Sequence, residues 1–220
     1  MFQYVLFDLD GTLTDPKAGI TSCVQYALAD AGIKEPDLDK LEPFIGPPLA
    51  DSFREFYGFD DEQIKRAIDK YHERFDEKGI FENEIIEGIP ELLKALKDAG
   101  RRVSIASSKP RPLVIRILEH FEIAQYFDTV VGSEFDGRFA TKEAVVEEAL
   151  RQLVPSVYEK EDVAMVGDRK FDIQGARAHG LTGIGVSFGY AGEHELEDAG
   201  ADYIVDTVEE LQRLLLQGCL

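Results

Sequence analysis

Hydrophobic residues follow two periodicities along this chain, one typical of buried strands and the other of amphipathic helices. Short, mostly apolar runs indicate buried strands, and they occur at 4–7, 103–106, 129–131, 163–166, 183–186 and 203–205. Apolar residues three and four positions apart indicate helices, and they occur at 89–96, 113–121, 142–153, 173–179 and 208–215. Strands and helices that alternate in this way predict an α/β fold with a parallel sheet and helices on both faces.

The segment between the first strand and this alternating pattern has a different character. Its periodicity indicates helices only, at about 18–31, 49–56 and 64–75. We therefore expect two domains. Residues 1–15 and 84–220 are expected to form a Rossmann-like core, and residues 16–83 a small all-α cap that is inserted after the first strand.

Polar residues gather where the predicted strands end. The first strand runs into Asp8-Leu9-Asp10-Gly11-Thr12, the second ends in Ser107-Ser108-Lys109, the fourth ends in Gly167-Asp168 with Asp172 four residues on, and Lys142 opens the helix after the third. Ligands of open parallel sheets bind at the carboxyl ends of the strands. We therefore expect these residues to meet at one edge of the sheet.

Each of these residue types suits one task in phosphoryl transfer. Asp8 can act as a nucleophile that carries an aspartyl-phosphate, and Asp10 can protonate the leaving oxygen and later activate water. Gly11 lets the backbone approach a phosphate closely and offer N–H groups to it. Ser107 can donate a hydrogen bond to a phosphoryl oxygen, and Lys142 can neutralise the charge that develops there.

The acidic residues of this set also predict a metal ion. Clustered carboxylates repel one another unless a cation neutralises them or one of them is protonated. Asp8, Asp10, Asp168 and Asp172 offer hard oxygen ligands, which suit Mg²⁺ as the cofactor. The predicted substrate or phosphate contacts are Gly11, Thr12, Ser107, Ser108, Lys142 and, in the insert, Gly46.

Taken together and in this order, the motifs resemble those of the haloacid dehalogenase superfamily. The resemblance rests on Asp8 to Thr12, Ser107, Lys142 and the run from Gly167 to Asp172, and it extends over nearly the whole chain. It implies a phosphatase similar to the phosphoglycolate phosphatase-like members, with the helical insert as a cap of the first type. It also implies that Asp8, the backbone carbonyl of Asp10 and Asp168 hold Mg²⁺, with Asp172 acting through water or from behind these ligands.

Two assignments stay open. Either Lys142 or Lys109 can be the phosphate-binding lysine, and we favour Lys142 because it precedes the strand that ends in Asp168. Gly46 lies in a stiff Gly-Pro-Pro loop, which either contacts the substrate or connects two helices. The insert is expected to be a mobile lid that selects the leaving group.

Asp10 narrows the reaction within the superfamily. Dehalogenases need no acid two residues after the nucleophile, and phosphonate-cleaving relatives carry a small residue there, so the acid favours phosphate esters. The substrate class is then a small phosphorylated metabolite, such as phosphoglycolate, a nucleoside monophosphate, a sugar phosphate or pyrophosphate. A sugar-phosphate mutase shares the four motifs and remains an alternative. A phospho-receiver signalling domain uses similar groups, but it is near half this length and carries its phosphorylated aspartate on an interior strand.

Composition adds expectations about partners and location. The chain has 24 Lys and Arg against 43 Asp and Glu, a net charge of −19, which repels nucleic acid and anionic membranes. We therefore expect neither as a partner, and the pattern predicts no particular oligomeric state. Cys23 and Cys219 lie far apart and indicate no disulfide framework, which fits the reducing cytoplasm.

Overall fold

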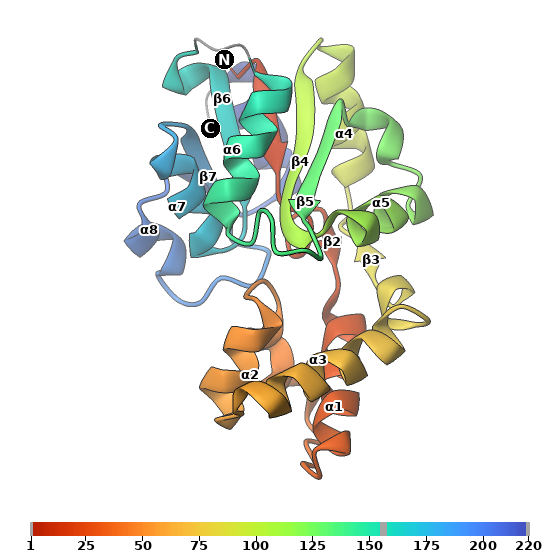
Figure 1. Cartoon of the computed structure of the whole chain (residues 1–220). Coiled ribbons are helices and arrows are strands. Elements are labelled where there is room, and N and C mark those ends of the chain that lie inside the picture. Colours follow the sequence, from red (N-terminus) through yellow and green to blue (C-terminus); the bar gives the residue numbers. More distant parts are fainter. Residues whose placement is uncertain (1, 155–157, 219–220) are drawn as a thin grey trace. The chain divides into compact units, whose positions relative to one another are not determined.

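The computed structural model of the chain describes residues 2–154 and 158–218 and divides into two compact units (Figure 1). Unit 1 comprises Met1–Thr14 and Ile85–Leu220, and unit 2 comprises Asp15–Glu84. The chain passes between the units through the two-stranded sheet of β2 (Thr14–Asp15) and β3 (Glu84–Ile85). Cys219 lies outside the described residues, and no helix within them has the length and apolar character needed to cross a membrane.

Unit 1 is built on a six-stranded parallel sheet of order β5-β4-β1-β6-β7-β8. The strands are β1 (Tyr4–Phe7), β4 (Arg102–Pro110), β5 (Thr129–Ser133), β6 (Val163–Gly167), β7 (Thr182–Val186) and β8 (Tyr203–Val205). Phe7, the last residue of β1, pairs with Ile105 on one side and with Val166 on the other. The carboxyl ends of these three strands therefore lie next to one another.

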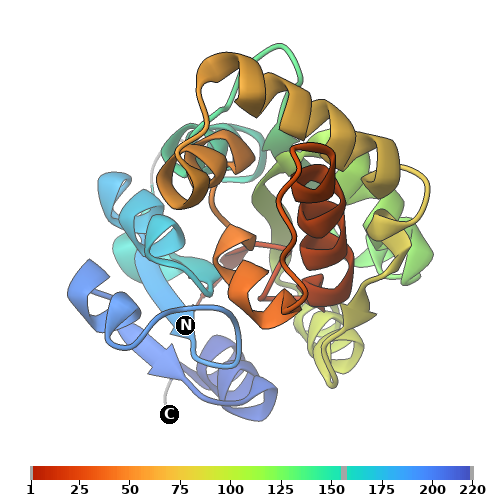
Figure 2. The same ribbon diagram turned by 90° about the horizontal axis from the view of Figure 1, so that it is seen from below.

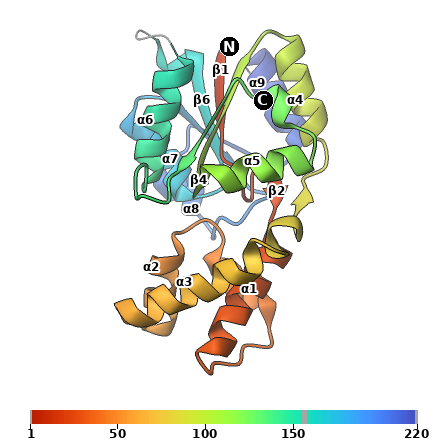
Figure 3. The ribbon, with the colours of Figure 1, turned by 45° about the vertical axis from the view of Figure 1, so that its right-hand side comes forward.

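Helices cover both faces of this sheet, which confirms the predicted fold class. The helices are α4 (Ile89–Asp98), α5 (Arg111–His120), α6 (Lys142–Leu153), α7 (Lys170–Ala178), α8 (Glu195–Ala199) and α9 (Val208–Gln217). Figure 3 shows α6 and α7 on one face and α4, α5 and α9 on the other. On the α6 face, Val145 and Val146 pack against Leu6, Ala106 and Met165 of the strands in one buried cluster. The central strands β1 and β6 are thus almost completely buried, which explains why their sequences are apolar.

The bounds of α6 and β8 agree with the prediction. Several other elements differ from it. Strand β4 extends to Pro110, beyond the predicted apolar run. Its last residues are mostly polar and therefore left no apolar signal in the sequence. Helix α8 was missed because it has only five residues, three of them acidic, and shows no apolar periodicity. Two 3₁₀ turns, η3 (Ala124–Tyr126) and η4 (Lys160–Asp162), are too short to leave a pattern.

Unit 2 is helical, and residues 16–83, all of which the structure describes, contain no strand. Its elements are α1 (Lys17–Asp30), η1 (Leu38–Phe44), α2 (Leu49–Tyr57), α3 (Asp61–Phe75) and η2 (Gly79–Phe81). Helix α3 packs along α1, as Figure 2 shows. The side chain of Asp60 accepts a hydrogen bond from the Gln63 amide and starts α3, while Gly58 ends α2 in the left-handed conformation.

A pair of glycines lets α1 approach η2 closely. A Cβ atom on Gly19 would lie 2.1 Å from the carbonyl oxygen of Gly79 and 2.7 Å from that of Glu82. A Cβ atom on Gly79 would lie 2.5 Å from the sulfur of Cys23. Backbone atoms cannot move aside as a flexible side chain can, so the position of Gly19 admits no larger residue without displacing η2.

We expect Gly19→Ala to destabilise the protein by about 1–3 kcal/mol, the usual effect of overpacking. This is opposite to the gain of about 1 kcal/mol that alanine normally brings to a helix interior. Urea unfolding followed by circular dichroism measures the difference. Ser22→Ala, on the same helix at a half-buried position, is the control and should change stability by less than about 0.5 kcal/mol. Equal stability of Gly19→Ala and the parent would contradict the close approach.

Candidate active site

The chain leaves β1 at Asp8 and folds at once into a tight turn. The Asp8 amide donates to the carbonyl of Val166 (2.9 Å), which continues the strand pairing by one residue. The carbonyl of Leu9 then accepts from the amides of residues 12, 13 and 14 at 2.9–3.2 Å. Gly11 has a φ of 80°, a left-handed conformation that favours glycine. The turn holds Asp8 and Asp10 at the carboxyl edge of the sheet, where each contacts a different lysine.

Lys142, the first residue of α6, is the buried cation of this site. Its Nζ lies 2.9 Å from Asp8 Oδ1 and 2.8 Å from Asp172 Oδ1, and it donates to the carbonyl of Ala106 at 3.1 Å. Burial acts to lower the pKa of Lys142, but the charges of Asp172 and Asp8 outweigh it and raise that pKa above the ordinary value. Lys142 therefore stays charged and ties the first strand to α7.

Asp168 and Asp172 complete the acidic cluster. Asp168 follows β6 and accepts hydrogen bonds from the Thr12 hydroxyl (3.2 Å) and the Tyr190 amide (2.8 Å). Asp172 lies in the first turn of α7, where it accepts from the Arg169 amide at 3.0 Å. One carboxylate oxygen from each of Asp8, Asp168 and Asp172 lies within 4.8 Å of the other two. The predicted strand ends thus do bring these three acids together.

Three glycines lie in close contact with this cluster. A Cβ atom on Gly11 would lie 2.1 Å from Asp168 Oδ2, and one on Gly167 would lie 2.1 Å from Asp172 Cγ. A Cβ atom on Gly189 would lie 2.3 Å from Asp168 Cβ. Sequence reasoning missed Gly189 and its neighbour Tyr190. Both follow β7. Because ligands of open parallel sheets bind at the carboxyl ends of the strands, the position of these two residues after a predicted strand was a signal that could have found them.

The charges of the cluster do not balance. Burial raises the pKa of Asp168 to about 8, with the charges of Asp172 and Asp8 adding to the effect. Burial also raises the pKa of Asp172 to about 6, against the opposing charge of Lys142. With Asp10, four carboxylates face two ammonium groups, those of Lys142 and Lys109. When all four carboxylates are ionised, two negative charges are left over, and one divalent cation with a preference for oxygen ligands neutralises them. The residues present therefore fit a divalent metal ion.

The other predicted site residues lie on β4 or in unit 2. Ser107 is buried, and its Oγ accepts a hydrogen bond from the Lys109 amide at 3.3 Å. The carbonyl of Ser108 accepts from the hydroxyl of Ser133 at 2.8 Å. Lys109, whose role the sequence left open, lies with its Nζ 2.6 Å from Asp10 Oδ2. Gly46 belongs to unit 2, between η1 and α2, with a φ of 102°, so its predicted part in substrate binding stays a prediction.

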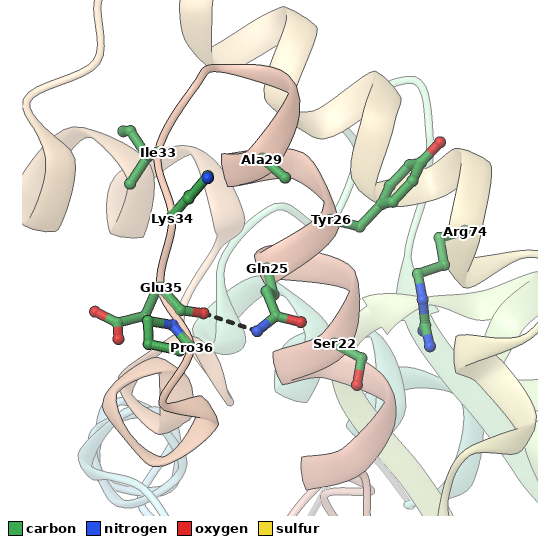
Figure 4. Close-up of a pocket in the computed structure, with 9 residues that line it drawn as sticks. All are labelled: Ser22, Gln25, Tyr26, Ala29, Ile33, Lys34, Glu35, Pro36 and Arg74. Carbon is green, nitrogen blue, oxygen red and sulfur yellow. Dashed lines mark hydrogen bonds between the residues drawn. The ribbon is translucent and has the colours of Figure 1, made fainter.

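Unit 2 has a hollow of its own, with a volume of about 450 Å³ (Figure 4). It lies between α1, the segment from Ile33 to Pro36, and Arg74 of α3. Gln25 crosses it and donates to the carbonyl of Glu35 at 2.7 Å. None of the residues predicted to take part in catalysis or phosphate binding lines this hollow.

Comparison with known proteins places the chain in a family. The family described as "Haloacid dehalogenase-like hydrolase" matches residues 5–186. A 5'-nucleotidase of Pseudomonas aeruginosa is 47% identical over 196 residues, which is 89% of this chain and 87% of that protein. The tyrosine-protein kinase PtkA of Mycobacterium tuberculosis is 38% identical over 97% of this chain and 72% of its own length. The crystal structure of a "predicted phosphatase" from Clostridium acetobutylicum is 46% identical, with a TM-score of 0.92 over 99% of both chains.

The chain belongs to the haloacid dehalogenase-like hydrolases. Within that family it is a phosphatase, an enzyme that hydrolyses phosphate esters. The resemblance stated from the four motifs is thereby confirmed.

We expect the metal-free protein to lose stability as the pH rises from about 4 to 8. The raised pKa values mean that folded Asp168 and Asp172 keep protons which the unfolded chain, with an aspartate pKa near 3.9, has already released. Even half of the shift of Asp168, from 3.8 towards about 8, corresponds to about 3 kcal/mol, or about 6–12 °C in Tm for a chain of this size. Thermal unfolding in excess chelator between pH 5 and 8 measures the trend.

Asp168→Asn is the matched control, because general repulsion from the net charge acts equally on both proteins. The variant should show a clearly flatter pH trend in chelator. Added Mg²⁺ should stabilise the parent more at pH 8 than at pH 5, where protons compete for the carboxylates. Parallel trends for the parent and Asp168→Asn would contradict the electrostatic account of the cluster.

Proposed function

We propose that this protein is a Mg²⁺-dependent phosphatase that hydrolyses a small phosphomonoester through an aspartyl-phosphate on Asp8. The observation that carries the proposal is the position of Asp8. It ends the first strand, in contact with the buried Lys142 and within 4.8 Å of two further carboxylates. A nucleophile, a cation for the phosphoryl oxygens and a metal-fitting set of acids are therefore adjacent.

The residues divide the reaction between them. An oxygen of Asp8 attacks phosphorus, and the bond from phosphorus to the leaving oxygen breaks while Asp10 gives that oxygen its proton. Water then attacks the phosphoryl group on Asp8 and gives its proton to Asp10, so that inorganic phosphate leaves and both acids return to their initial state. Lys142 balances charge on the phosphoryl oxygens. When bound, Mg²⁺ would be held by Asp8, Asp168 and the carbonyl of Asp10, and it would supply positive charge that lets an anionic carboxylate approach an anionic phosphate.

Nucleoside 5'-monophosphates are the first substrate class to examine. The relative that is 47% identical is named a 5'-nucleotidase, and phosphoglycolate comes next because a phosphoglycolate phosphatase is 25% identical. A mutase or a kinase of the same fold would deliver the phosphoryl group to another hydroxyl. Measuring inorganic phosphate release from a panel of phosphometabolites separates hydrolysis from transfer.

Asp8→Asn should reduce turnover by at least about 10⁴-fold, because the amide keeps the shape but lacks the attacking charge. Phosphate release from the best substrate of the panel measures the loss. The variant should fold, since it removes one of the repelling charges, and its Tm in chelator should equal or exceed that of the parent. Retention of more than a few per cent of the activity would count against Asp8 as the nucleophile.

Metal dependence gives a separate test. Mg²⁺ should activate the chelated enzyme and raise its Tm in a concentration-dependent way. Ca²⁺ should also raise Tm but should support much less turnover, because its larger and looser ligand shell places the reacting groups less well. Full activity in excess chelator would rule out the metal.

A further inference from the structure

Strand β4 carries a bulge at the edge of the site. Its residues Ser104 to Ser107 pair one to one with β5, from Thr129 to Gly132. The next pair joins Pro110 to Ser133, so the register shifts at Ser108 and Lys109, which form the bulge. Bulges of this kind redirect a side chain or end a pairing, and they are frequent beside active sites.

Specific contacts hold this bulge in place. A Cβ atom on Gly132 would lie 2.6 Å from the carbonyl oxygen of Lys109 and 2.7 Å from the amide nitrogen of Arg111, so the bulged backbone rests directly on that glycine. The hydroxyl of Ser133 donates to the carbonyl of Ser108, and the Lys109 amide donates to Ser107 Oγ. These contacts fix the conformation of the bulge within unit 1.

The bulge delivers the side chain of Lys109 to Asp10. The Nζ of Lys109 lies 2.6 Å from Asp10 Oδ2, and the two side chains are only 8% and 13% exposed. The other oxygen, Asp10 Oδ1, is buried and accepts no hydrogen bond from the part of the chain that the structure describes. One oxygen of the carboxyl group is thus held by a lysine, while the second remains available to another partner.

We propose that Lys109 is a positioning residue that orients Asp10 for proton transfer to the leaving group. The hydrogen bond from Lys109 to Oδ2 restricts rotation of the carboxyl group. Oδ1 can then exchange a proton first with the leaving oxygen and later with water. The two lysines then have separate tasks: Lys142 serves Asp8 and the phosphoryl group, and Lys109 serves Asp10. The inference rests on the proposed function of Asp10 as the acid and base.

The dependence of rate on the leaving group separates this role from phosphate binding. An alkoxide leaves poorly without a proton, whereas the acetate of acetyl phosphate leaves without one. Because kcat/KM reports the steps up to phosphoryl transfer to Asp8, a defect in proton donation should appear in kcat/KM for glycerol 2-phosphate and not for acetyl phosphate. A lysine that bound the phosphoryl group would matter equally for both substrates.

The experiment compares Lys109→Met, Asp10→Asn, their double variant and the parent on these two substrates. Lys94→Met, at an exposed lysine of α4, is the control for loss of one positive charge. We expect Lys109→Met to lower kcat/KM for glycerol 2-phosphate by about 10²-fold, the scale of general acid catalysis, and to leave that for acetyl phosphate nearly unchanged. In the Asp10→Asn background, the lysine substitution should add little, because its partner is already lost.

The opposite results would overturn the proposal. Equal losses on both substrates, or a loss that adds fully to that of Asp10→Asn, would assign Lys109 to the phosphoryl group. No loss on either substrate would remove it from the reaction. Gly132→Ala gives a second route, since it displaces the bulge without touching a charge, and it should weaken glycerol 2-phosphate turnover selectively. Phosphate release by the parent and its absence in Asp8→Asn test the proposed function separately. A failure of the Lys109 proposal can therefore be distinguished from a failure of the proposed function.

Discussion

Repulsion between buried carboxylates is the constraint on which the site depends. Asp8, Asp168 and Asp172 are buried, and one carboxylate oxygen from each lies within 4.8 Å of the other two. Ionised groups at such distances destabilise the fold unless opposite charges lie among them. Lys142 meets two of the acids and a backbone carbonyl at once, and this shared cation ties the first strand, β4 and α7 together. Under the proposed function, a divalent metal ion would offset the negative charge that remains and would thereby help the site to accept a phosphate.

Close packing turns this charge arrangement into a defined geometry. Gly11, Gly167 and Gly189 let backbone segments touch the side chains of Asp168 and Asp172, so these two carboxylates are confined by atoms that do not move easily. Gly132 plays the same part for the bulge that carries Lys109. Positioning groups before the substrate arrives lowers the reorganisation needed during reaction. The rigidity comes from absent side chains as much as from present ones.

The fold alone leaves the reaction partner undefined. Relatives that share most of this chain carry different names, among them a 5'-nucleotidase and a tyrosine-protein kinase. A parallel sheet with a polar carboxyl edge supports any phosphoryl transfer, because it supplies a nucleophile, a cation and a metal site without specifying the acceptor. Under the proposed function, proton transfer to the leaving group falls to Asp10, which Lys109 contacts.

The sequence by itself determined the alternation of strands and helices, the all-helical unit 2 and the acids at the strand ends. Those features follow from local periodicity and from a rule about where parallel strands end, so they need no knowledge of contacts. Only the tertiary structure decided which lysine meets which acid. The direction of Lys109 depends on a register shift between β4 and β5, and Gly189 reaches Asp168 from a strand two places along the sheet from β1. Such contacts join residues about 20 to 180 positions apart, and nothing in the spacing of the residues records them.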